Sequence, residues 1–171
     1  GEGGRDVVFG VVADVHRARR VEFYAMGNAR VVALDGQHKF FRFRIPTALY
    51  GDSHLFALAA DLLGPGDVVI AISNSGRLPE LLQAVDIARA RGADVIAIGN
   101  SQSPLARAAT VCLAVDHAED STLFLSMISR ILQLLFIDIM AVGLSVDAHN
   151  GRDGTDSDVE KRRLLISHLD S

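Results

Sequence analysis

Two hydroxyl side chains and a glycine interrupt the stretch "AISNSGRLPEL", where a run of small apolar residues gives way to a helix-like segment. The amides that open a helix lack intrahelical acceptors, and the helix dipole adds partial positive charge there. Ser73 and Ser75 add hydroxyl donors, and Gly76 lets the backbone approach a bulky oxyanion. Phosphate is the anion that this turn predicts. The alternative is that Ser75 only caps the helix and Gly76 only forms the turn.

A second and weaker signal is the stretch "AMGNAR", in which Gly27 and Asn28 separate an expected strand from an expected helix. One glycine does not make a dinucleotide fingerprint, which needs two more at fixed spacing. The sequence also lacks the G-x-x-x-x-G-K-[ST] pattern of a nucleotide P-loop. The two turns therefore predict an anion site that is not a nucleotide site.

Apolar runs alternate with helical periods along most of the chain. This alternation predicts a parallel sheet with helices on both faces, an α/β fold with three layers and a doubly wound, flavodoxin-like order. In such a sheet, ligands bind beyond the carboxyl ends of the strands, where the strand order reverses. The five expected strands are Val21–Met26, Thr47–Tyr50, Asp67–Ile72, Val95–Ile98 and Val111–Ala114.

A long helix is expected over about residues 120–146, with only a narrow polar stripe that includes Ser129 and Gln133. A helix that is apolar around most of its circumference must be covered on more than one side. A partner subunit would cover it in a homodimer; the alternative is burial by the first and last helices of the same chain. Its apolar run, residues 131–146, is expected to be too short to span a membrane.

The composition changes after Val146. "DAHNGRDGTDSD" predicts a loop, and Ser157 with Glu160 forms a capping box that predicts a terminal helix. The expected division is therefore one domain over residues 1–146, followed by a polar loop and a C-terminal helix over residues 147–171.

The bulk composition narrows the class of protein. The net charge of −4 does not favour direct nucleic-acid binding by these 171 residues. The single cysteine, Cys112, and the absence of a signal-peptide pattern at the start favour a cytoplasmic protein. The six histidines show no paired metal spacing, so neither a metal nor another cofactor is expected.

The S-x-S-G turn after a buried strand resembles that of the SIS (sugar isomerase) domain. Longer segments, "GQHKFFR", "GDVVIAISNSGR", "SPLARAA", "HAEDST" and "SMISRILQLLFIDIMAVG", are similar to the SIS domain of RpiR-family bacterial transcriptional regulators, and of their HexR branch most of all. The resemblance covers about residues 17–146. It implies an effector domain, not an enzyme, in a regulator of carbohydrate metabolism.

That resemblance also implies the ligand and the partners. The ligand would be a phosphorylated sugar or sugar acid, which for the HexR branch is 2-keto-3-deoxy-6-phosphogluconate. The chain would form a dimer or tetramer, and DNA would be bound by a separate N-terminal helix-turn-helix domain that is not in this chain. The implied ligand-binding residues are Gly27, Asn28, Ser73, Asn74, Ser75, Gly76, Arg77 and Glu119.

This sequence departs from the family pattern at both turns. Ala25 and Ala29 replace the outer Gly and the Ser of the first turn, and Leu78 replaces the Thr of the second. Two hydroxyl ligands are thereby lost. Asn28, through its amide, and Arg77, through a charge-assisted bond, could replace them. Otherwise the pocket binds weakly, takes another ligand or is empty.

Glu119 and His117 precede the long helix and raise a second possibility. In sugar-phosphate isomerases, a carboxylate moves a proton between adjacent carbons and a histidine assists ring opening. An aldose–ketose isomerase acting on a sugar phosphate is therefore the alternative function. In the regulators, the corresponding Glu would instead contact sugar hydroxyls.

Overall fold

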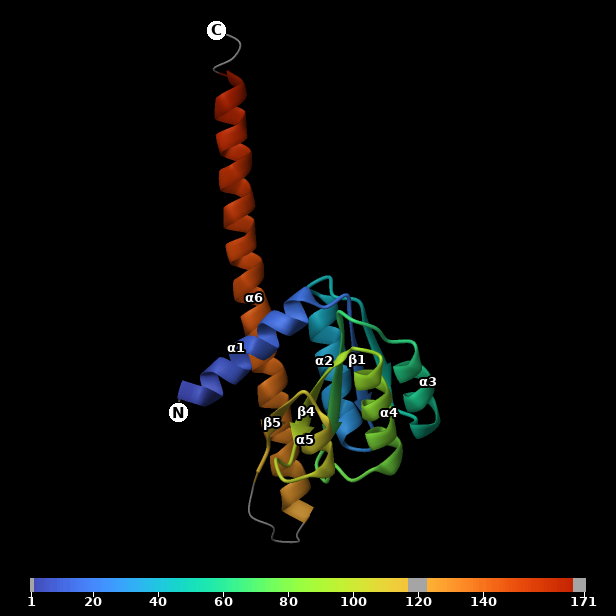
Figure 1. Ribbon diagram of the computed structural model, residues 1–171. Coiled ribbons are helices and arrows are strands. Elements are labelled where there is room, and N and C mark those ends of the chain that lie inside the picture. Colours follow the sequence, from blue (N-terminus) through green and yellow to red (C-terminus); the bar gives the residue numbers. More distant parts are fainter. Residues whose placement is uncertain (1, 117–122, 168–171) are drawn as a thin grey trace.

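The computed structural model describes residues 2–116 and 123–167, with side chains over 3–116 and 127–149. The strands are β1 Arg20–Ala25, β2 Thr47–Tyr50, β3 Asp67–Ser73, β4 Asp94–Gly99 and β5 Val111–Ala114. The helices are α1 Glu2–Arg17, α2 Ala29–Phe41, α3 Ser53–Asp61, α4 Pro79–Ala90, α5 Pro104–Ala108 and α6 Leu123–Ser167. All neighbouring strands pair in parallel, in the order β2-β1-β3-β4-β5, which confirms the predicted α/β fold (Figure 1).

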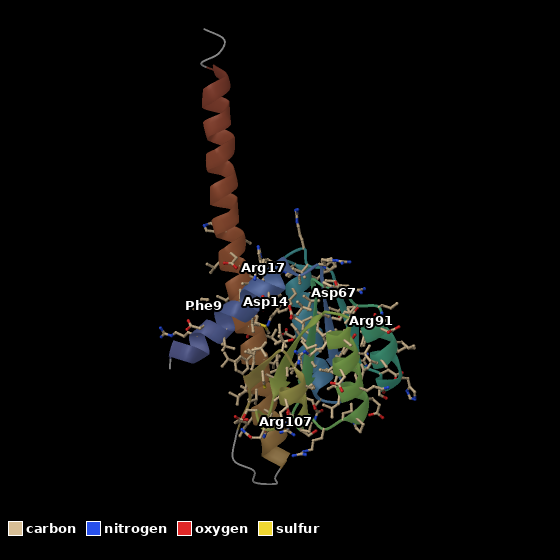
Figure 2. All side chains as sticks on the ribbon, viewed as in Figure 1. Phe9, Asp14, Arg17, Asp67, Arg91 and Arg107 are labelled. Atoms are coloured by element: carbon tan, nitrogen blue, oxygen red, sulfur yellow. The ribbon has the colours of Figure 1, made fainter. Side chains whose placement is uncertain are left out.

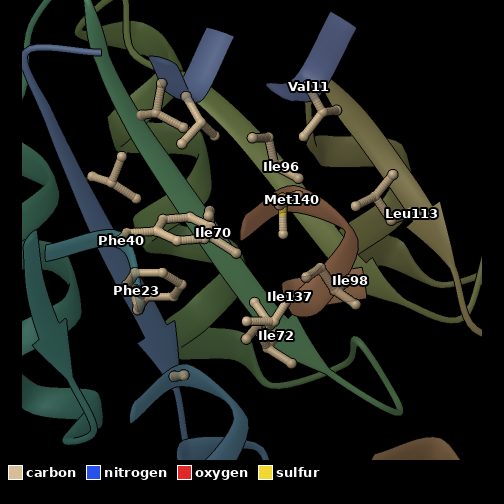
Figure 3. Close-up of a cluster of buried hydrophobic side chains, with 14 of the residues drawn as sticks. Val11, Phe23, Phe40, Ile70, Ile72, Ile96, Ile98, Leu113, Ile137 and Met140 are labelled. Atoms are coloured by element: carbon tan, nitrogen blue, oxygen red, sulfur yellow. The ribbon is translucent and has the colours of Figure 1, made fainter. Parts of the chain in front are cut away.

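The sheet is buried on both faces, which explains why its central strands have continuous apolar runs instead of alternation. In β3, Ile70 and Ile72 contribute to the core beneath α1, α2 and α6, whereas Val69 and Ala71 contribute to the core beneath α3, α4 and α5. Figure 3 shows the first core, in which Phe23 and Phe40 lie near Ile70. The two cores hold the strands, and therefore the turns that follow them, in a fixed frame.

The strand order reverses between β1 and β3. The chain leaves β1 towards β2 on one side of the sheet and leaves β3 towards β4 on the other. Ala25 pairs with Ile72 at the carboxyl ends of these two neighbouring strands. The turns that begin at Met26 and at Asn74 therefore meet at the position where doubly wound sheets bind their ligands.

The predicted loop after Val146 is wrong. α6 is one continuous helix of 45 residues, and it runs through the polar, Gly-rich segment to Ser167. Figure 1 shows it extending well beyond the sheet. Each glycine costs a helix only about 1 kcal/mol relative to alanine, whereas the residue that breaks a helix, proline, does not occur in this segment. The separate terminal helix predicted from the capping box is the end of α6.

α6 has one buried face and one exposed apolar face. Its buried apolar side chains Ile137, Met140 and Leu144 pack in the first core. α1 crosses it closely, since a Cβ at Gly143 would lie 2.8 Å from the Val12 methyl groups. Among the side chains of α6 that the structure describes, those of residues 127–149, the exposed apolar ones are Met127, Ile128, Ile131, Leu135, Ile139, Val142 and Val146.

The apolar part of α6 is longer than the sequence run suggested. By length and composition alone, residues Met127–His149 could cross a membrane, contrary to the expectation that this helix is too short. The core helix of a soluble protein, which is mostly buried, meets the same criterion; of this segment 22% is buried, on the face that packs in the first core.

Candidate functional site

A cavity of about 280 Å³ lies at the point where the strand order reverses. Its polar lining comes from the two turns after β1 and β3, and its apolar lining comes from the strand ends and the starts of α2 and α4. The lining residues are Met26, Asn28, Ala29, Ile72, Ser73, Asn74, Ser75, Leu78 and Leu81. The structure thus brings together the two turns that the sequence analysis selected separately.

The two serine side chains of the second turn are held by the backbone. Ser73 Oγ accepts a hydrogen bond from the Gly76 amide at 3.0 Å, and Ser75 Oγ accepts one from the Arg77 amide at 3.4 Å. A hydroxyl that accepts such a bond still has its own hydrogen to donate. Both serines can therefore offer a donor to an anion in the cavity.

Gly76 is required for a different reason from the one predicted. Its φ of +58° lies in the left-handed region, and a Cβ there would lie 2.4 Å from Ser103 Oγ and 2.6 Å from Ser103 Cβ. Its carbonyl accepts a bond from the Leu105 amide at 3.1 Å. Gly76 therefore packs against the start of α5 and does not line the cavity, so the close approach is to the protein itself.

The two helices that start at the cavity have no side-chain cap. Leu78 precedes α4 and makes no side-chain cap hydrogen bond, and Pro79 follows as the first helical residue. Asn28 precedes α2 and likewise makes none. In α4 the first residue, Pro79, has no N–H, and in α2 the Arg30 amide bonds the Gly27 carbonyl, so the amides offered to an anion are those that follow in the first turn of each helix.

Asn74 is linked to α6. Its Oδ1 accepts a hydrogen bond from Nε2 of Gln133, a side chain that is only 1% exposed. The polar stripe predicted on the long helix includes Gln133, but nothing in the sequence connects this residue with the turn. A polar residue at a core-facing position of a helix was the available signal.

The predicted ligand residues divide into three groups. Asn28, Ser73, Asn74 and Ser75 line the cavity. Gly27, with φ +58°, adjoins Asn28, while Gly76 and the exposed Arg77 lie outside the lining. Glu119, with His117, lies outside the described residues.

Two of the three departures from the family pattern fall inside the cavity, while Ala25 is the last residue of β1 and does not line it. Ala29 and Leu78 both contribute to its lining. The other apolar lining residues, Met26, Ile72 and Leu81, are not among the predicted ligand residues, because in a sequence apolar side chains at strand and helix ends cannot be distinguished from core residues.

A second cluster of polar side chains comes from β1 and the start of β3, and all of them except the half-buried Arg20 are buried. Tyr24 Oη donates to Glu22 Oε2 at 2.7 Å, and the Arg20 guanidinium lies 3.6 Å from Glu22 and 3.3 Å from Asp67. Burial raises the pKa of Glu22, although the Tyr24 bond and Arg20 oppose it. Burial and the bond to Glu22 raise the pKa of Tyr24. None of these four side chains lines the cavity, so we assign the cluster a structural role.

Together, the fold and the cavity define a class: a doubly wound α/β domain with donor groups gathered where the strand order reverses. The SIS domain family matches residues 14–143, and the chain belongs to that family.

Curated relatives match the same region. The chain is 57% identical over 129 residues to Bifunctional protein glk of Burkholderia orbicola (strain AU 1054), covering 75% of this chain and 20% of that protein. It is 37% identical over 151 residues to the HTH-type transcriptional regulator HexR of Pseudomonas aeruginosa, covering 88% and 51%. The chain thus spans about a fifth to a half of the length of these relatives.

Solved structures share the fold. The Vibrio vulnificus NanR protein complexed with ManNAc-6P superposes with a TM-score of 0.79 at 24% identity, covering 91% of this chain and 60% of that one. The sugar isomerase domain of an RpiR transcription factor from Sphaerobacter thermophilus gives a TM-score of 0.74 at 21% identity, covering 91% and 86%.

Proposed function

We propose that this chain is the effector-binding domain of a bacterial transcriptional regulator of the RpiR family and that it binds a phosphorylated sugar or sugar acid. The observation that carries the proposal is the cavity between β1 and β3, where serine hydroxyls and two uncapped helix starts converge. An oxyanion there would be stabilised by donors already in place. The complex of NanR with ManNAc-6P supports a phosphorylated ligand on this fold.

The regulatory role rests on the relatives. HexR is named as an HTH-type transcriptional regulator, and the chain covers about half of it. The identity to Bifunctional protein glk is higher, so we propose the role at the level of the RpiR family and not of the HexR branch. In this role the protein is cytoplasmic, and DNA is bound by another part of the longer protein.

Assembly through α6 is part of the proposal. Its exposed apolar side chains form a surface that would be covered by a second copy of the chain, as the sequence analysis expects. A dimer would carry two ligand sites and would set the spacing of two DNA-binding domains.

The alternative, an aldose–ketose isomerase, needs an acid–base group at the ligand. Within the part of the chain that the structure describes, the cavity lining contains no histidine and no carboxylate. The two residues considered for that role, His117 and Glu119, lie outside the described residues.

Isothermal titration calorimetry would test the proposal. We expect heat from one or more of 2-keto-3-deoxy-6-phosphogluconate, N-acetylmannosamine 6-phosphate and glucose 6-phosphate, and none from the matching unphosphorylated compounds. Ser75→Ala should weaken binding about tenfold, because a hydrogen bond to a charged group is lost. Ser145→Ala, an exposed serine on α6, is the matched control and should bind normally. Folded protein that gives no heat with any phosphorylated compound would refute the proposal.

A further inference from the structure

Two buried polar side chains, Ser129 and Gln133, interrupt the apolar stripe by which α6 packs on the sheet, and Gln133 is bonded to the turn after β3. Gln133 continues the face formed by Ile137, Met140 and Leu144, and it is buried as completely as they are. Burying an amide costs free energy unless it is hydrogen bonded, and an apolar side chain of similar size would pack there without that cost. The burial of an amide at this position therefore indicates that the hydrogen bond of Gln133 has a role beyond packing.

In the structure, that bond turns the amide oxygen of Asn74, in the turn after β3, towards α6. Gln133 Nε2 donates to Asn74 Oδ1, and Asn74 also lines the cavity. An asparagine amide has an acceptor oxygen on one side and a donor NH₂ group on the other. With the oxygen turned to α6, the NH₂ group is left to donate elsewhere. The opposite orientation would present a carbonyl oxygen, which repels an anion.

The other two polar side chains of the turn do not depend on α6. Ser73 and Ser75 are held by the amides of Gly76 and Arg77, within the turn itself. Asn74 is thus the member of the turn whose orientation is set by another element.

We propose that Gln133 is a positioning residue: it holds the Asn74 amide so that its NH₂ group donates to the phosphate of the bound ligand. This inference rests on the proposed function, since it requires an anion at this turn. It also makes α6 part of the ligand site. Any rearrangement that separates Gln133 from Asn74 would lower the affinity, and by linkage ligand binding would oppose that separation.

The first test is Gln133→Met, which keeps the size of the side chain and removes the donor. Titration with inorganic phosphate should show affinity lower by about tenfold or more, while the melting temperature is unchanged or higher. A purely structural Gln133 predicts instead that stability falls and that affinity is kept in the folded fraction. Gln37→Met, the same change at a half-buried position of α2 away from the cavity, should leave phosphate affinity unchanged.

A double-mutant cycle tests whether Gln133 acts through Asn74. If it does, Asn74→Ala and the double variant Asn74→Ala/Gln133→Met should bind phosphate equally weakly. Losses that multiply in the double variant would show that Gln133 acts by another route and would overturn the inference.

Asn74→Asp provides a test that leaves the core intact, because Asn74 is exposed. Gln133 would hold one carboxylate oxygen and the other would face the phosphate, so binding should be lost. Unchanged binding in Asn74→Asp, or in Gln133→Met, would overturn the role of Gln133 while leaving the proposed function intact. A wild-type protein that binds neither phosphate nor a phosphorylated sugar would instead refute both.

Discussion

At the residue scale, the site depends on a few side chains and backbone positions. For some of them, the contacts in the structure differ from the role that the sequence predicts. Ser73 and Ser75 both line the cavity, and their contact with an anion stays a prediction. Gly76 was predicted to allow the close approach of an oxyanion, whereas a Cβ there would meet Ser103. The partner came from α5, so no reading of the local turn could have identified it.

Comparing two glycines separates backbone strain from this close contact. Gly27 and Gly76 have the same φ of +58°, yet a Cβ at Gly27 meets nothing within 4 Å. Gly27→Ala should therefore cost only the left-handed strain, about 1 kcal/mol. Gly76→Ala should cost about 2 kcal/mol or more, because Ser103 must also move. Urea unfolding would measure both, and equal losses would contradict the contact.

At the element scale, strands and helices were predictable where the hydrophobic pattern is strong. All five strands appear within about one residue of their expected bounds, because both faces of the sheet are buried. The exception is α6, whose polar segment after Val146 was predicted to be a loop. Composition alone does not show that a helix can continue through a polar, Gly-rich segment. The link between Gln133 and Asn74 was equally hidden, since it joins elements 59 residues apart.

The buried polar cluster at the start of β1 makes a prediction about pH. Burial raises the pKa of Glu22 in the folded protein, so the folded state binds this proton more tightly than the unfolded chain does. Glu22 therefore contributes stability below the ordinary pKa of glutamate, and this contribution is lost as the pH rises through the folded-state value.

Glu22→Gln removes that dependence. The stability of the variant relative to wild type should therefore increase with pH through this window, by about 1.4 kcal/mol for each unit by which the pKa is raised. Urea unfolding of both proteins from pH 4 to pH 8 would measure it. A difference that does not change with pH would show that Glu22 is ionised as easily in the folded protein as in the unfolded chain.

At the scale of the whole molecule, the surface is distinguished by its exposed apolar residues. Phe9 of α1, labelled in Figure 2, is 70% exposed and lies with Val142 beside an apolar groove between α1 and α6. Further exposed leucines lie on α3, at the other face of the sheet. A second copy of the chain would cover one of these two surfaces in a dimer.

Placing a charge on each surface would distinguish them. Val142→Asp, at a position that is 63% exposed, should convert the proposed homodimer to a monomer, since a carboxylate would be buried in an apolar interface. Leu58→Asp on α3, at a position 67% exposed, is the matched control and should leave the dimer intact. Sedimentation velocity would report the mass of each. If Leu58→Asp dissociates the dimer and Val142→Asp does not, the interface lies on α3 and not on α6.

The length of α6 turns small movements at its base into larger ones at its end. From its crossing with α1 at Gly143, the helix continues to Ser167, about 36 Å at 1.5 Å per residue. A tilt of about 5° at that crossing would sweep its end through roughly 3 Å, close to the rise of two helical residues. A helix that projects this far therefore converts a small tilt within the packed domain into a displacement of several ångströms at its end.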